Sequence, residues 1–128
     1  MSNLKCRILY VDDHEDSSEM LKVVLSDSGY EVQTAHSVDN ALKLAASEQF
    51  DLYVLDKRLP DGSGLELVRR LNELTPGVPS IVYTGDAYDI HKQEAIAAGA
   101  HAYVSKPDID GLIATVHRLL MNAECATA

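Results

Sequence analysis

The chain has 128 residues and a mass of 14.0 kDa, which suits one domain with a single hydrophobic core. Hydrophobic residues make up 46% of it and charged residues 24%, so a disordered composition is excluded. Its 20 acidic and 11 basic residues leave a net charge of −9, which argues against nucleic acid or an anionic membrane surface as a direct partner. We expect one domain over residues 1–128, with a core at about 6–121 and a short C-terminal tail.

The cysteines and the N-terminus carry no sign of export. Cys6 and Cys125 lie near opposite ends of the sequence without the spacing of metal ligands, so neither a disulfide framework nor a zinc site is predicted. The first residues lack a basic stretch followed by a signal-length apolar run, and nothing in the sequence is expected to span a membrane. These features favour a cytoplasmic location.

Five short runs rich in Val, Ile, Leu and Tyr predict strands that begin near residues 7, 31, 51, 80 and 101. The second run alternates between polar and apolar residues, which favours an edge strand. Between and after the strands, apolar residues recur three or four positions apart, as at Leu65, Val68 and Leu71, which predicts amphipathic helices. This (βα)5 pattern predicts an α/β fold, a doubly wound five-stranded parallel sheet with helices on both faces.

Several residues mark the expected helix ends. Ser63 and Glu66 have the spacing of a capping box, and Ser37 precedes another helical segment. Gly29 and Gly99 lie where two helices should end, because glycine readily adopts the left-handed conformation of a helix C-terminal turn.

Polar side chains stand at the ends of four predicted strands. These residues are Asp12 and Asp13, then Asp56, then Thr84, and finally Ser105, Lys106 and Pro107. In a doubly wound sheet the carboxyl ends of the strands form one edge, where ligands bind. Carboxylates about 4 Å apart repel each other by roughly 1 kcal/mol in water and about 4 kcal/mol at an effective dielectric of 20, so a cation is needed. Oxygen ligands without cysteine or paired histidines favour Mg²⁺.

Such a set of residues has a recognisable chemistry. An aspartate beside Mg²⁺ can attack phosphorus and form an acyl phosphate. The metal, the ammonium of Lys106 and the hydroxyl of Thr84 would then offset the negative charge on the transferred group. The strand ends therefore predict a phosphoryl-accepting site.

Four motifs, in order and spacing, resemble the response-regulator receiver family of two-component signal transduction. They are Val-Asp-Asp at 11–13, Leu-Asp-Lys-Arg-Leu-Pro-Asp-Gly-Ser-Gly-Leu at 55–65, Tyr-Thr-Gly at 83–85 and Lys-Pro at 106–107. The resemblance covers the chain from Ile8 to about Leu120. It implies the flavodoxin-like strand order 2-1-3-4-5, and a signalling protein whose only catalysis is its own phosphorylation and autodephosphorylation.

The same resemblance implies a role for each polar residue at the strand ends. Asp56 is the expected phosphoacceptor, and Lys106 is expected to contact the phosphoryl group. The expected Mg²⁺ ligands are Asp13, Asp56 and the backbone carbonyl of Arg58. Asp12 is expected to act through a water molecule bound to the metal.

A conformational switch is also implied. The hydroxyl of Thr84 is expected to turn toward the phosphoryl group, and Tyr103 to swing inward behind it. The surface that responds is the fourth helix, the fifth strand and the fifth helix. Backbone contacts to the phosphoryl group are expected from Lys57 and Gly85, and the peptide bond before Pro107 is expected to be cis.

Two positions in this pattern are less typical, Arg58 and Asp86. They lie two residues after the expected phosphoacceptor and two after Thr84, so they flank the path of an attacking water. We hypothesise that they pair as a lid that slows loss of the phosphoryl group. Replacing both with alanine should then shorten the phosphorylated lifetime, measured as the decay of the phosphorylated mass; an unchanged lifetime would contradict the hypothesis.

Each of these residues has a simpler interpretation when it is taken alone. Asp12 and Asp13 could cap the first helix, Lys106 could be a solvated surface lysine, and Tyr103 a half-buried strand residue. His14, beside the acidic pair, could join the metal shell, although a lone histidine there is more often a surface residue. Only the combination of residues favours the phosphoryl-accepting site.

Other functions remain open at this point. A flavin-binding module would use the same crevice, but its first loop should offer amides and hydroxyls to a phosphate, whereas this loop is Asp-Asp-His-Glu-Asp at 12–16. A magnesium-dependent phosphatase would carry a second aspartate where Arg58 stands. The chain could also be a receiver from a hybrid kinase or a longer regulator, or a degenerate receiver that signals by binding alone.

The expected partners follow from the resemblance. They are a histidine kinase or a histidine phosphotransfer protein as phosphoryl donor, and a downstream protein target. The chain is expected to be a monomer or a phosphorylation-dependent dimer.

Overall fold

The computed structural model describes residues 6–85, 89–106 and 108–121. Its centre is a five-stranded parallel sheet in the order β2-β1-β3-β6-β7. The strands are β1 (Arg7–Val11), β2 (Glu31–Ala35), β3 (Leu52–Leu55), β6 (Ser80–Thr84) and β7 (Ala102–Ser105). The predicted strands, their order and the edge position of the second strand are therefore confirmed.

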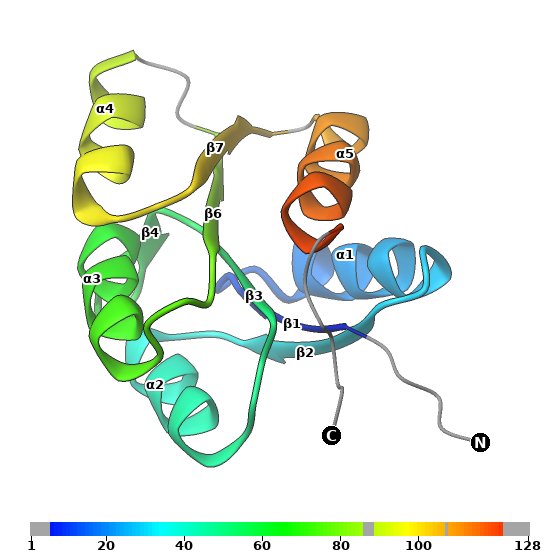
Figure 1. Cartoon of the computed structure of the whole chain (residues 1–128), viewed down its shortest axis with the longest axis horizontal. Coiled ribbons are helices and arrows are strands. Elements are labelled where there is room, and N and C mark those ends of the chain that lie inside the picture. Colours follow the sequence, from blue (N-terminus) through cyan, green and yellow to red (C-terminus); the bar gives the residue numbers. More distant parts are fainter. Residues whose placement is uncertain (1–5, 86–88, 107, 122–128) are drawn as a thin grey trace.

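Helices cover both faces of the sheet (Figure 1). One face carries α1 (Glu15–Asp27) and α5 (Ile109–Leu120). The other carries α2 (Val38–Ser47), α3 (Gly64–Leu74) and α4 (Asp89–Ala98). This is the doubly wound arrangement that the alternation of strands and helices predicts.

The sheet divides the hydrophobic core into two layers because side chains alternate along each strand. In β1, Ile8 and Tyr10 pack with the buried residues of α1 and α5. Leu9 and Val11 pack instead with those of α2, α3 and α4. Strands buried on both faces are apolar almost throughout. Polar residues follow directly after several of these strands, at their carboxyl ends.

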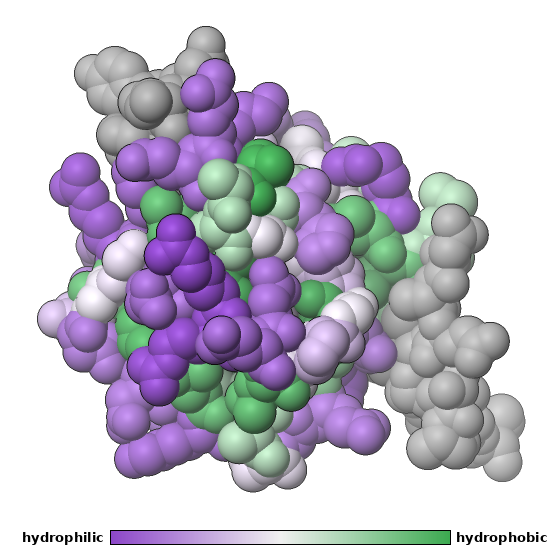
Figure 2. All heavy atoms as spheres, turned by 60° about the vertical axis from the view of Figure 1, so that its left-hand side comes forward, coloured by the Kyte–Doolittle hydropathy of each residue, from purple (hydrophilic) through white to green (hydrophobic). Residues whose placement is uncertain are grey.

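Figure 2 shows the face covered by α2, α3 and α4, where most exposed side chains are hydrophilic and the apolar areas are separated by polar ones. Leu74 and Ile96 are among the large apolar side chains that remain exposed, each by 46%. No helix of the described residues is long and apolar enough to cross a membrane.

The predicted helix ends are largely confirmed. Ser37 caps α2 by accepting a hydrogen bond from the amide of Asn40, at 3.1 Å. Ser63 caps α3 through the amide of Leu65, at 3.0 Å. The carboxylate of Glu66 lies 3.3 Å from a guanidinium nitrogen of Arg69, so it pairs along the helix. Two glycines also end helices with positive φ, 99° at Gly29 and 114° at Gly99.

A small antiparallel hairpin, β4 (Arg58–Leu59) and β5 (Gly62–Ser63), lies between β3 and α3 and was not predicted. Its turn brings Asp61 to the start of α2. The carboxylate of Asp61 accepts hydrogen bonds from the amides of Val38, at 2.8 Å, and Asp39, at 3.0 Å. A residue distant in sequence therefore caps α2 alongside Ser37.

We expect Asp61→Ala to lower the Tm at neutral pH, because two amides at the start of α2 lose their acceptor. Hydrogen bonds from Asp39 and Val38 hold the pKa of Asp61 below its usual value. The stabilisation is therefore present above the unfolded-state pKa of about 3.9 and is lost as the pH falls through the lower folded-state pKa. The measurement is Tm against pH for both proteins.

The control for this effect is Asp39→Asn, which removes one charge from the same helix end but no acceptor of these two amides. We expect Asp61→Ala to lie below wild type at pH 7 and to converge with it in acid. The same profile in both variants would mean that charge alone, and not the cap, is responsible.

One expectation about the cysteines is wrong. Cys6, directly before β1, is disulfide-bonded in the structure, whereas the sequence spacing predicts no disulfide framework. Cys125 lies outside the described residues.

Candidate functional site at the carboxyl ends of the strands

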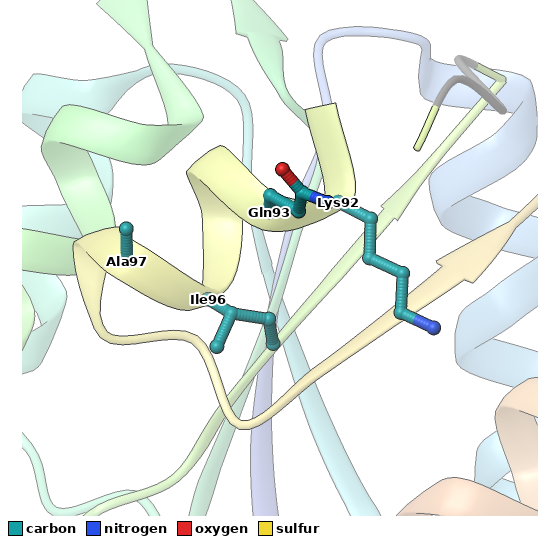
Figure 3. A pocket seen from close by; sticks show the side chains of 4 residues that line it. All are labelled: Lys92, Gln93, Ile96 and Ala97. Carbon is teal, nitrogen blue, oxygen red and sulfur yellow. The ribbon is translucent and has the colours of Figure 1, made fainter. Parts of the chain in front are cut away.

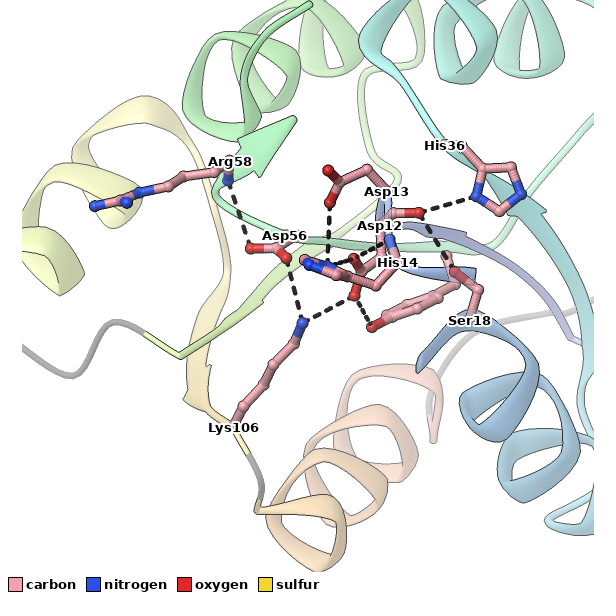
Figure 4. A network of polar contacts seen from close by, with 9 residues as sticks. Asp12, Asp13, His14, Ser18, His36, Asp56, Arg58 and Lys106 are labelled. Carbon is pink, nitrogen blue, oxygen red and sulfur yellow. Dashed lines mark hydrogen bonds and ion pairs between the residues drawn. The ribbon is translucent and has the colours of Figure 1, made fainter. Parts of the chain in front are cut away.

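The carboxyl ends of β1, β3 and β7 bring three charged groups together (Figure 4). The ammonium nitrogen of Lys106 lies 2.8 Å from Oδ2 of Asp12 and 3.2 Å from Oδ2 of Asp56. Asp12 has no exposed surface and Asp56 is 7% exposed. One lysine thus links two buried carboxylates that come from neighbouring strands.

Asp12 has the densest set of polar contacts in this network. Its Oδ2 accepts a hydrogen bond from the hydroxyl of Tyr10 at 2.8 Å, as well as the contact from Lys106. Its Oδ1 accepts from the amide of His14 at 3.0 Å, and His14 is the N-cap residue of α1. The side chain of Asp12 therefore orders the start of this helix as well as belonging to the site. Its backbone carbonyl contacts the side chains of Ser18 and His36.

The charges in this pair stabilise each other. Burial favours the neutral carboxylic acid, but the hydrogen bond from Lys106 and those from His14 and Tyr10 lower the pKa of Asp12. Burial likewise disfavours the ammonium, yet Asp12 and the charge of Asp56 raise the pKa of Lys106. Both groups are ionised at neutral pH as a result.

His14 lies over the acidic pair. Its Nδ1 is 3.0 Å from Oδ1 of Asp12 and 3.2 Å from Oδ1 of Asp13, although 69% of its side chain is exposed. The hydrogen bond to Asp12 and the charge of Asp13 raise the pKa of His14. From the sequence, His14 could be a surface residue or a metal ligand. In the structure its side chain is exposed and also contacts the carboxylates of Asp12 and Asp13.

The donor set fits a hard divalent cation. Asp12, Asp13, His14 and Asp56 each offer one ligand atom, and these atoms lie within 4.8 Å of one another. Carboxylate oxygens from three aspartates suit Mg²⁺, which keeps several water ligands and takes few protein ligands. The residues present therefore fit the ion that the sequence predicts.

The segment after Asp56 is packed against it. The amide of Arg58 lies 3.4 Å from Oδ1 of Asp56, and its side chain points away from the carboxylates (Figure 4). The amide of Gly64 donates to the carbonyl of Lys57 at 2.7 Å. A Cβ at Gly64 would come within 2.0 Å of the backbone carbonyl oxygen of Asp56, so only glycine allows α3 to start this close to the site.

We therefore expect Gly64→Ala to destabilise the protein by about 1–3 kcal/mol, the usual cost of forcing extra volume into a packed region. Chemical denaturation of wild type and variant measures this. Gly85→Ala is the control, because a Cβ at Gly85 meets nothing within 4 Å. Equal stability of Gly64→Ala and wild type would contradict the close approach.

The remaining predicted residues are placed as follows. Thr84, at the end of β6, is 5% exposed, and its carbonyl accepts from the amide of Lys106 at 2.8 Å. Gly85 is exposed beside it. Tyr103 is partly buried on the opposite face of the sheet from Tyr10. Asp86 and Pro107, and with them the lid pairing and the cis peptide bond, lie outside the described residues.

Two tyrosines that sequence reasoning missed belong to this site. Tyr10 reaches Asp12 as described, and the ammonium of Lys106 lies 5.7 Å from the ring centroid of Tyr83. The signal for Tyr10 was available: in an extended strand, residues two apart point to the same face. Tyr83 could not be assigned in this way, since its partner, Lys106, follows a different strand, β7.

Comparison with known proteins identifies the fold and the family. A model of the response regulator receiver domain matches residues 8–117. The response regulator protein PilR of Pseudomonas aeruginosa is 37% identical over 117 residues, 88% of this chain and 26% of that protein. The phosphate regulon transcriptional regulatory protein PhoB of the same species is 38% identical over 102 residues, 78% of this chain and 44% of PhoB. The chain thus spans about a quarter to a half of the length of these relatives.

Solved structures agree. The chemotaxis response regulator CheY4 of Vibrio cholerae superposes with a TM-score of 0.84 at 31% identity, covering 91% of this chain and 99% of that one. The response regulator TrrA of Thermotoga maritima, solved in complex with Mg²⁺-BeF, has a TM-score of 0.82 at 34% identity, with coverages of 90% and 99%. The chain therefore belongs to the response regulator receiver domain family of two-component signalling.

Proposed function

We propose that this receiver domain accepts a phosphoryl group on Asp56 and that its phosphorylation changes the shape of the surface that a partner reads. The observation that carries the proposal is the position of Asp56, whose carboxylate is nearly buried yet contacts Lys106 and lies within the cluster of possible metal ligands. A nucleophile, a fixed positive charge and a cation site are thereby gathered at one strand edge. Few other chemistries need all three.

In the proposed reaction a carboxylate oxygen of Asp56 attacks phosphorus, the bond from phosphorus to the donor nitrogen breaks, and the donor histidine leaves with its electron pair. Lys106, already 3.2 Å from Asp56, would contact an oxygen of the transferred group. Bound Mg²⁺ would neutralise charge on the phosphoryl oxygens. The Mg²⁺ would be held by Asp12, Asp13, Asp56 and the backbone carbonyl of Arg58. The amides of Lys57 and Gly85 would contact the phosphoryl group.

The conformational response to phosphorylation would pass through Thr84 and Tyr103. The hydroxyl of Thr84 would turn to the phosphoryl group, and the ring of Tyr103 would move inward behind it. Both residues lie on the paired strands β6 and β7, next to α4. Four residues of α4 line a surface pocket of about 600 Å³, namely Lys92, Gln93, Ile96 and Ala97 (Figure 3). We propose that α4, β7 and α5 form the surface that a protein target reads.

The domain would act on no external substrate, and its catalysis would be limited to its own phosphorylation and dephosphorylation. The donor would be a phosphohistidine of a histidine kinase or of a histidine phosphotransfer protein in the cytoplasm. We propose no direct contact with nucleic acid, in keeping with the net charge of −9. The described residues would act as a single domain, as a monomer or a phosphorylation-dependent dimer.

The test is incubation of the wild-type chain with acetyl phosphate, with Mg²⁺ or with excess chelator, followed by intact mass spectrometry. We expect one acid-stable, base-labile phosphoryl adduct that forms only with the metal. If Mg²⁺ binds but no adduct forms, the chain is a degenerate receiver that signals through binding alone. An adduct that forms equally well in chelator would contradict the role of the metal.

A further inference from the structure

Tyr10 is a buried residue at the floor of the site. It has no exposed surface and lies in β1 on the face covered by α1 and α5. Its hydroxyl donates to Oδ2 of Asp12 at 2.8 Å. Because Tyr10 and Asp12 are two residues apart at the end of an extended strand, both side chains point to the same side of the sheet.

Oδ2 of Asp12 has a second donor, the ammonium of Lys106, which also contacts Asp56. In the proposed reaction this ammonium must contact the phosphoryl group on Asp56 instead. Asp12 is completely buried, and a buried carboxylate oxygen that loses its donor is costly. Among the contacts of Oδ2 in the described part of the chain, only the Tyr10 hydroxyl would remain.

We propose that Tyr10 is a positioning residue for the metal and phosphoryl chemistry, acting through Asp12. Its hydroxyl holds Oδ2, so that Oδ1 stays directed toward Asp13 and His14, where the candidate ligands gather. It also gives Oδ2 a donor of its own, so that Lys106 is free to leave. This inference rests on the proposed function.

The hydroxyl is suited to this task. A phenolic hydroxyl is a donor at neutral pH, and the carboxylate of Asp12 is its acceptor at 2.8 Å. Partners that orient a metal-binding carboxylate in this way typically change metal affinity by about 10–100-fold when they are removed. A phenylalanine ring fills the same volume without the donor.

The experiment compares Tyr10→Phe with wild type in Mg²⁺ binding, measured by calorimetric titration of the intact chain. The matched control is Tyr53→Phe. Tyr53 is equally buried and lies on the adjacent strand β3. Its side chain is on the opposite face of the sheet from Tyr10, where its hydroxyl is hydrogen-bonded to the hydroxyl of Thr75. We expect affinity for Mg²⁺ to fall about tenfold in Tyr10→Phe and to stay unchanged in Tyr53→Phe.

A second comparison separates positioning from a general loss of stability. In an Asp12→Ala background, Tyr10→Phe should cause no further loss of Mg²⁺ affinity, since the group it orients is gone. The inference would be overturned if Tyr10→Phe left the Mg²⁺ affinity unchanged, or if Tyr10→Phe and Tyr53→Phe lowered it equally. It would also be overturned if Tyr10→Phe lowered the Mg²⁺ affinity as much in the Asp12→Ala background as in wild type. If wild type itself binds no Mg²⁺, the proposed function fails and takes this inference with it.

Discussion

Asp56→Asn should form no phosphoryl adduct with acetyl phosphate and Mg²⁺, whereas wild type should be phosphorylated once. The carboxamide has the shape of the carboxylate but lacks a nucleophilic oxygen that could form an acyl phosphate. Intact mass spectrometry and peptide mapping measure both the extent and the position of the modification. Asp39→Asn is the control, because it removes an exposed aspartate on α2 that pairs with Lys43.

The same variant should fold at least as well as wild type. Asp56 and Asp12 share one ammonium, so removing one carboxylate charge relieves repulsion within the site. Loss of the adduct together with an unchanged or higher Tm would therefore identify Asp56 as the acceptor. An adduct of normal yield on Asp56→Asn would place the acceptor elsewhere.

Lys106→Met should destabilise the metal-free protein by about 1–3 kcal/mol. Removing one partner of a fully buried ion pair costs about 3–5 kcal/mol, and we reduce this because the lysine side chain is 24% exposed. The variant leaves Asp12 and Asp56 without their shared counter-charge. Added Mg²⁺ should then raise its Tm more than that of wild type, because the metal no longer competes with the ammonium for the carboxylates.

The direction in which the pKa of Lys106 is shifted determines how the stability difference between wild type and Lys106→Met depends on pH. The folded-state pKa of Lys106 is raised, so its contribution is fully present below the ordinary lysine pKa of about 10.4 and is lost as the pH rises through the folded-state value. Wild type and Lys106→Met should therefore differ by a constant amount across neutral pH.

Thermal unfolding with and without Mg²⁺ tests both statements. Lys43→Met is the matched control, since Lys43 is 74% exposed and its pair with Asp39 lies at the surface, where such pairs contribute little. If Mg²⁺ raised the Tm of Lys106→Met no more than that of Lys43→Met, the lysine would not compete with the metal for these carboxylates.

Most of the fold could be predicted from local patterns. Strands buried on both faces are short apolar runs, and the helices that cover them repeat their apolar residues every three or four positions. Caps such as Ser37 and Ser63 depend on a neighbour in the sequence. For the same reason the gathering of polar residues at one sheet edge was foreseeable, since parallel strands place all their carboxyl ends there.

What escaped prediction depends on how closely distant segments approach. The hairpin before α3 has two strands of two residues each, too short to leave a periodic pattern. Its turn carries Asp61 to the start of α2, a contact over more than twenty positions of sequence. The disulfide at Cys6 likewise left no signal in the spacing of the cysteines.

The sequence by itself determined the order of strands and helices, the edge at which the site lies and the family of the chain, because each depends on residue periodicity or on a short motif. Only the tertiary structure decided the contacts within the site. It placed one ammonium between Asp12 and Asp56, and it started α3 at Gly64 against the carbonyl of Asp56. These contacts depend on distances of a few ångströms between separate elements, which packing sets and no local pattern records.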